Sequence, residues 1–134
     1  MKNEKELYKN LLSIAKKISK NSYSPYSKFK VGCAVLCDNG EIYTGTNIEN
    51  ASYGLTMCAE RVAVCNAVSN GVKKIKAVAV YADKAGTAPC GACRQVIFEF
   101  SKNADIIYNS KNNKIKIENI KSLLPDSFCA KSLK

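Results

Sequence analysis

Three cysteines and one glutamate are the residues of this sequence best suited to chemistry. Cys58 and Glu60 lie two positions apart, and further along the chain Pro89 precedes Cys90 and Cys93, which lie three positions apart. Catalytic zinc takes three protein ligands, keeps a fourth position for water and needs a base beside that water. The three cysteines can provide the ligands and Glu60 the base. Because the chain contains no histidine, a metal site in it has to use thiolates or carboxylates.

The only two arginines of the chain lie next to these cysteines. Arg61 follows Cys58 by three residues, and Arg94 directly follows Cys93. Three thiolates on Zn²⁺ leave a net charge of −1, which makes the ion a poor Lewis acid. Guanidinium groups that hydrogen-bond to the thiolates would withdraw electron density from them. We expect this role for both arginines; the alternative is that they cap helices or form surface pairs.

Other interpretations of the cysteines fit less well. A closed structural zinc site needs a fourth ligand, but Cys65 lies about 10 Å along a helix from Cys58, too far to bind the same ion. A redox pair formed by Cys90 and Cys93 would leave Cys58 and Glu60 without a role. Small buried side chains are the expected role of the other cysteines, which are Cys33, Cys37, Cys65 and Cys129.

Helices and strands must bring these residues together. Hydrophobic periodicity and turn signals predict three helices. The first covers residues 4–20, the second runs from an N-cap at Thr56 to a C-cap at Asn70-Gly71, and the third covers 91–101. Strands are predicted over 30–37, 41–47, 75–81, 104–109 and 114–117. Asn39-Gly40 predicts a hairpin between the first two strands. Residues 83–90 are expected to form a loop. Cys58 then lies in the first turn of one helix, and Cys90 and Cys93 at the start of another. Helix N-termini stabilise thiolates.

Composition predicts one soluble domain spanning residues 1–134. The chain is 46% hydrophobic and 24% charged, as expected for a globular α/β protein. No apolar run approaches the roughly 20 residues of a membrane span, and no export signal is recognisable. Seven cysteines in such a chain indicate reduced thiols. We therefore expect a cytoplasmic protein without a membrane partner.

The formal net charge of +10 could indicate a nucleic-acid partner, but its distribution argues against one. All of the basic residues except two are lysines, and they are scattered along the whole chain. Recognition of bases and phosphates usually draws on clustered arginines with aromatic residues between them. We expect no nucleic-acid partner.

Together the motifs resemble the small homotetrameric cytidine deaminases. The resemblance runs roughly from Ser24 to Phe128 and rests on S-P-Y-S-K-F-K-V-G at 24–32, N-I-E-N-A-S-Y-G at 47–54, C-A-E-R at 58–61 and P-C-G-A-C-R-Q at 89–95. The cysteines and glutamate match the all-cysteine version of the zinc nucleobase deaminase signature. One departure is Lys30, where the family often has proline, and the segment after Phe128 is too divergent to compare.

The resemblance implies a three-layer α/β/α fold with a mixed five-stranded sheet. It also implies one zinc ion per subunit on the three cysteines, with Glu60 as the proton shuttle. Asn47 and Glu49 are expected on the ribose 3′-hydroxyl, Phe29 stacked on the pyrimidine, and Phe128 in the site of a neighbouring subunit. On an extended segment, the side chains of an Asn and a Glu two residues apart point to the same face, which suits a hydroxyl that both donates and accepts a hydrogen bond.

The expected activity is zinc-dependent hydrolytic deamination of cytidine and deoxycytidine to uridine and deoxyuridine plus ammonia, as in pyrimidine salvage. Deamination of a blasticidin-type nucleoside or of a polynucleotide cytosine would use the same zinc chemistry. The Asn47/Glu49 pair argues against a polynucleotide, because it would engage a free 3′-hydroxyl. A binding module with a structural zinc is the non-enzymatic alternative, and Glu60 argues against that.

Overall fold

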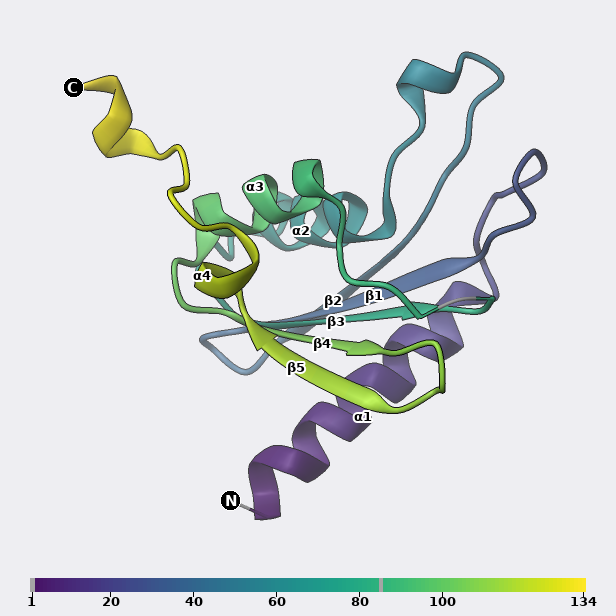
Figure 1. Ribbon diagram of the computed structural model, residues 1–134, viewed down its shortest axis with the longest axis horizontal. Helices are drawn as coiled ribbons and strands as arrows, with labels where there is room; N and C mark the ends of the chain where they lie inside the picture. Colours follow the sequence, from purple (N-terminus) through teal and green to yellow (C-terminus); the bar gives the residue numbers. More distant parts are fainter. Residues whose placement is uncertain (1, 85) are drawn as a thin grey trace.

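A computed structural model describes residues 2–84 and 86–134 as a five-stranded sheet with helices on both faces (Figure 1). The strands run in the order β2-β1-β3-β4-β5; β3 and β4 are parallel and the other neighbouring pairs antiparallel. The strands are β1 (Val31–Cys37), β2 (Ile42–Thr46), β3 (Ile75–Ala82), β4 (Asp105–Asn109) and β5 (Ile115–Asn119). The helices are α1 (Lys2–Ser19), α2 (Ala59–Ser69), α3 (Gly91–Phe100) and α4 (Ile120–Leu123), with 3₁₀ turns at Tyr53–Leu55 and Ala130–Leu133.

Helix α1 covers one face of the sheet, and α2 and α3 cover the other (Figure 1). The expected three-layer arrangement and mixed sheet are therefore confirmed. Two buried clusters fill the interfaces: one joins α1 to β1, β3 and β4, and the other joins the opposite face to α2 and α3. Because the inner strands are covered on both sides, β1 is buried along its whole length and β3 along most of it. None of the helices in the described ranges is long and apolar enough to cross a membrane.

Two glycines let the helices lie directly against the sheet. A Cβ atom at Gly32 in β1 would lie 2.0 Å from the carbonyl oxygen of Ala15 in α1. A Cβ atom at Gly45 in β2 would lie 2.4 Å from the backbone nitrogen of Ala63 in α2. Side chains at these positions would push both helices outward, so the glycines fix the distance between the layers. The position of α2 matters most here, because α2 carries Glu60.

The boundaries of most elements agree with the sequence pattern to within two residues. Gly40 takes the positive φ expected in the first hairpin, and Gly71 does so after α2. The predicted N-cap of α2 is wrong: Cys58, not Thr56, is the N-cap. The reason is a backbone bridge between Ile48 and Met57, which keeps the chain extended up to Cys58. The expected 83–90 loop is described except at Ala85, which lies outside the described residues.

Candidate active site

The thiols of Cys58, Cys90 and Cys93 converge at the N-termini of α2 and α3. Their sulfur atoms all lie within 4.8 Å of one another, and those of Cys90 and Cys93 are 3.5 Å apart. Tetrahedral zinc with Zn–S bonds of about 2.3 Å separates its ligand sulfurs by about 3.8 Å. Three thiols at this spacing fit a zinc ion with small adjustments of their side chains.

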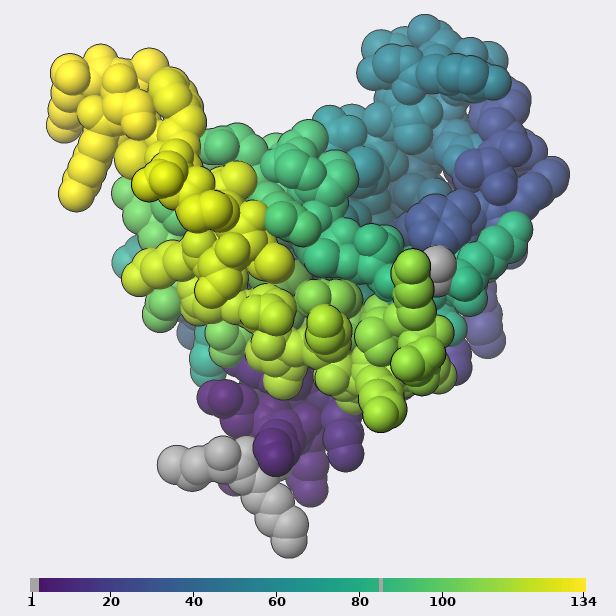
Figure 2. All heavy atoms as spheres, viewed as in Figure 1, coloured from purple at the N-terminus to yellow at the C-terminus, as the bar shows by residue number. Residues whose placement is uncertain are grey.

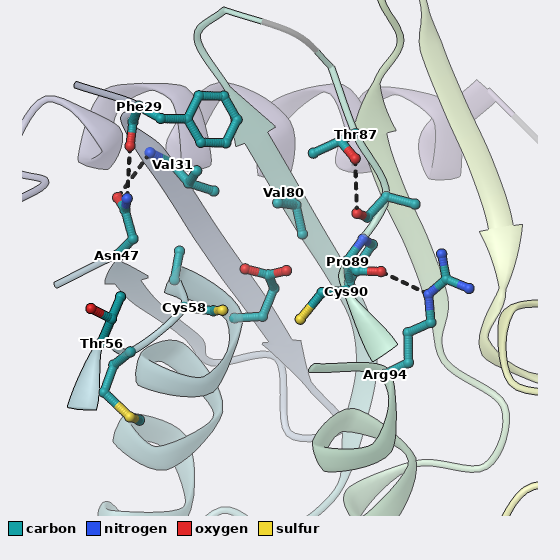
Figure 3. Close-up of a pocket in the computed structure, with 14 residues that line it drawn as sticks. Phe29, Val31, Asn47, Thr56, Cys58, Val80, Thr87, Pro89, Cys90 and Arg94 are labelled. Carbon is teal, nitrogen blue, oxygen red and sulfur yellow. Dashed lines mark hydrogen bonds between the residues drawn. The ribbon is translucent and has the colours of Figure 1, made fainter. Parts of the chain in front are cut away.

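Helix capping leaves two of these thiols free to bind a metal. Cys58 is the N-cap of α2 and Cys90 the N-cap of α3, and neither side chain makes a capping hydrogen bond. Figure 3 shows the two side chains directed toward one another across a cavity. Both helices therefore turn their positive dipole ends toward the sulfur atoms, which favours the thiolate form.

Arg61 is placed beside the sulfur cluster as expected. Its Nη2 lies 3.8 Å from Cys58 Sγ and donates to the carbonyl of Thr56 at 3.3 Å. The hydrogen bond from Cys93 lowers the pKa of the Cys58 thiol to about 5, and Arg61 contributes to the shift. The same hydrogen bond, together with burial, raises the pKa of Cys93. The Nε of Arg61 is buried without a hydrogen-bond partner among the described residues, so the guanidinium keeps a donor beside the thiols.

Arg94 makes different hydrogen bonds from those expected. Its Nε donates to the carbonyl of Pro89 at 2.7 Å and its Nη1 to the carbonyl of Leu123 at 2.8 Å. These bonds join the residue before Cys90 to the end of α4. Arg94 thus braces the backbone that carries Cys90 instead of bonding to a thiol in the described structure.

Glu60 lies in the first turn of α2 and is buried, with 5% of its surface exposed. Burial raises the pKa of its carboxyl group, and the negative charge of Cys58 adds to the shift. A carboxyl group with a raised pKa can both accept and return a proton near neutral pH. Since Cys58 is the cap and not a residue of the helix interior, Cys58 and Glu60 can line the same cavity.

This cavity has a volume of about 430 Å³, large enough for a small organic molecule. Phe29 forms the wall opposite the cysteines (Figure 3). Sequence reasoning missed several lining residues, because strand and loop side chains become neighbours only when the layers assemble. The missed residues are Val31, Thr56, Met57, Ala59, Val80, Thr87, Ala88 and Pro89.

Asn47 and Glu49 lie in adjoining cavities. Asn47 is buried and lines the cavity of the cysteines, whereas Glu49 lines a neighbouring one of about 380 Å³. Thr56 lines both. Hydrogen bonds lower the pKa of the Glu49 carboxylate, and the largest contribution comes from the Ser27 hydroxyl. The two predicted sugar ligands are thus adjacent, but they do not share one cavity.

Phe128 stands apart from the cavity. Its side chain is 58% exposed, and its carbonyl accepts a hydrogen bond from Gln95 Nε2 at 2.9 Å. The C-terminal segment that follows it projects from the body of the molecule (Figures 1 and 2). Within the described chain, this phenylalanine therefore does not enclose its own cavity.

Comparisons with known proteins agree with this geometry. A family model described as the cytidine and deoxycytidylate deaminase zinc-binding region matches residues 5–110, which include all three clustered cysteines and Glu60. The chain belongs to this family. A cytidine deaminase of Sporosarcina psychrophila is 48% identical over 126 residues, covering 92% of each chain. One of Halalkalibacterium halodurans is 42% identical over 92% of this chain and 95% of its own.

Solved structures show the same relationship. The crystal structure of a cytidine deaminase from Burkholderia pseudomallei matches with a TM-score of 0.83 and 39% identity, covering 89% of this chain and 97% of that one. The resemblance seen in the motifs is confirmed, and this member of the deaminase family is an enzyme of the hydrolase class.

Proposed function

We propose that this deaminase hydrolyses free cytidine and deoxycytidine to uridine and deoxyuridine, with release of ammonia, in cytoplasmic pyrimidine salvage. One domain, residues 1–134, would hold one zinc ion on Cys58, Cys90 and Cys93. The observation that carries the proposal is the position of buried Glu60 in the same cavity as this sulfur cluster. The named relatives support the substrate class.

The chemistry is divided between the metal and Glu60. Zinc, when bound, supplies a water molecule of lowered pKa. Glu60 would accept a proton from the attacking water, which adds to C4 of the pyrimidine, and deliver it to N3. Glu60 would then take the proton left on the new C4 hydroxyl and deliver it to the departing amine, so that ammonia leaves as the C4 carbonyl forms. Arg61 offsets the charge of the thiolates, and Arg94 holds the backbone before Cys90 in place.

The cavity would bind the nucleoside through its base and its sugar. Phe29 offers an aromatic face on the wall opposite the cysteines, suited to stacking on a pyrimidine. Asn47 and Glu49 lie at adjoining cavities and would together engage the ribose 3′-hydroxyl. This contact requires a free hydroxyl, so it favours nucleosides over polynucleotides.

Self-association into a homotetramer would complete the site. Phe128 is exposed, and further apolar side chains are exposed on loops at the opposite side of the molecule from the C-terminal segment (Figure 2). A second copy that covers such surfaces would remove them from water. Phe128 could then stack in a neighbour's cavity. The exposed loop residues are Tyr23, Tyr26, Ile48, Tyr53 and Leu55.

A substrate panel tests the proposed activity and its selectivity. Loss of the cytidine ultraviolet absorbance and release of ammonia should be followed with cytidine, deoxycytidine, 3′-deoxycytidine, blasticidin S and single-stranded DNA. We expect turnover of the first two and kcat/KM for 3′-deoxycytidine lower by ~10- to 100-fold, because Asn47 and Glu49 lose their partner. Equal deamination of single-stranded DNA and cytidine would instead establish a polynucleotide deaminase.

Truncation before Phe128 tests whether neighbouring subunits share sites. We expect KM to rise about 2- to 10-fold through loss of an aromatic stacking face, and the sedimentation coefficient to fall as assembly weakens. Mixing the inactive Glu60→Gln variant with Phe128→Ala should restore activity slowly as subunits exchange. Assay immediately after mixing is the control, and a fully active monomer would contradict the shared site.

A further inference from the structure

The carboxamide of Asn47 is almost fully occupied by the protein itself. Its Oδ1 accepts hydrogen bonds from the backbone nitrogen of Val31, at 3.0 Å, and from the hydroxyl of Ser22. Its Nδ2 donates to the carbonyl of Phe29 at 2.7 Å (Figure 3). A carboxamide has two acceptor sites and two N–H donors. One N–H therefore remains, and it is available to the cavity that Asn47 lines.

The carboxylate of Glu49 is occupied in a complementary way. Its Oε1 accepts from the backbone nitrogens of Tyr26 and Ser27 at 2.9 and 3.1 Å, and its Oε2 accepts from the Ser27 hydroxyl. Counting two acceptor sites on each oxygen leaves one site free. The pair thus offers one donor and one acceptor, which is the complement of a single hydroxyl group.

Ser22 reaches Asn47 from a different part of the fold than Phe29 and Val31. It lies in the turn after α1, where its backbone nitrogen bonds to the carbonyl of Ser19 at 3.0 Å. The next residue, Tyr23, donates to the backbone carbonyl of Asn47 at 3.2 Å. Because Oδ1 carries no proton, the Ser22 hydroxyl has to be the donor in its bond to Asn47. Ser22 thereby connects the end of α1 to the carboxamide.

We propose that Ser22 is a positioning residue that holds the Asn47 carboxamide with its single free N–H directed to the sugar hydroxyl. The inference rests on the proposed function, because it requires Asn47 to contact the nucleoside 3′-hydroxyl. The other two partners of the carboxamide both belong to the segment that carries Phe29. Those two partners are backbone groups where the chain enters β1, whereas Ser22 lies in the turn after α1. Ser22 thus adds a side-chain donor that holds the carboxamide from a second element of the fold.

The test combines a change in the protein with a change in the substrate. Replacing Ser22 by alanine should raise KM for cytidine about 2- to 10-fold, the effect of one net hydrogen bond, with kcat nearly unchanged. KM for 3′-deoxycytidine should stay the same, because that substrate lacks the group that Asn47 reaches. Ser22→Thr, which retains the hydroxyl, should behave as the wild type. Ser13→Ala, an exposed serine on α1, is the matched control.

An equal rise in KM for both substrates would overturn the inference, since it would show a general effect on the loop. Unchanged KM for both would overturn it as well. Wild-type enzyme that uses cytidine and 3′-deoxycytidine equally would remove the sugar contact and with it the role of Ser22. Failure to deaminate cytidine at all would contradict the proposed function instead. Circular dichroism melting checks the fold of each variant. If Ser22→Ala unfolds, Ser22→Cys replaces it, because cysteine is a weak donor of similar size, and it should raise KM for cytidine alone by an intermediate amount. The absence of this rise in KM would overturn the inference.

Discussion

Replacing Glu60 by glutamine should abolish nearly all turnover while leaving the fold and the bound zinc in place. Removing a positioned acid or base typically slows an enzyme 10²- to 10⁴-fold. Here one carboxylate would serve several proton transfers, so we expect kcat to fall by ~10⁴-fold or more. Glutamine has nearly the same shape, and as a neutral group it carries no penalty for burial of charge. The melting temperature should therefore not fall.

The measurement is kcat for cytidine, with zinc content and melting temperature determined on the same sample. Glu99→Gln is a matched control, because Glu99 is exposed on α3 outside the cavity. It should retain wild-type activity. A loss of less than about tenfold in Glu60→Gln would show that this carboxylate does not carry the proton transfers.

Replacing Cys90 by alanine should release the zinc ion and destabilise the N-terminus of α3. Three thiolates hold the ion in the proposed site, and two remaining ligands bind zinc far more weakly. Because zinc binding is coupled to folding, the melting temperature should fall together with the zinc content. We expect about one zinc per subunit in the wild type, well below one in the variant, and no measurable deamination.

Elemental analysis after dialysis measures the zinc content directly and does not depend on activity. Cys65→Ala is the control, since Cys65 is an exposed cysteine outside the cluster. It should keep its zinc and its activity. Full zinc occupancy in Cys90→Ala would contradict the assignment of the ligands. Treatment of the wild type with a strong chelator should reproduce the loss of zinc and of stability.

The placement of the three cysteines at the N-termini of two helices was predictable from the sequence, because the signals for each helix are local. The pattern C-x-E predicts ligand and base within one helix turn, and P-C-x-x-C predicts two ligands at the start of another. Hairpin and capping signals at Gly40 and Gly71 are local too, and both glycines have the positive φ expected. The fold class followed from the order of these elements together with the resemblance.

Other features depended on contacts between distant segments, which no local pattern encodes. Thr56 is not the N-cap of α2, because a bridge between Ile48 and Met57 keeps the chain extended for longer than the sequence suggests. Arg94 follows a cysteine in sequence, yet its guanidinium finds carbonyl acceptors at Pro89 and Leu123. The carbonyl of Leu123 becomes available only when α4 packs beside α3.

Asn47 and Glu49 show the division most clearly. The sequence by itself determined that these two residues bear hydrogen-bond donors and acceptors, and the resemblance implied that a sugar hydroxyl would meet them. Only the tertiary structure decided how many of those groups remain free for a substrate. Ser22 lies far from Asn47 along the chain, and its hydroxyl reaches the carboxamide because α1 packs against β1 at Gly32. Hydrogen-bonding capacity is a property of the residue, but its use is set by whatever the fold places within bonding distance.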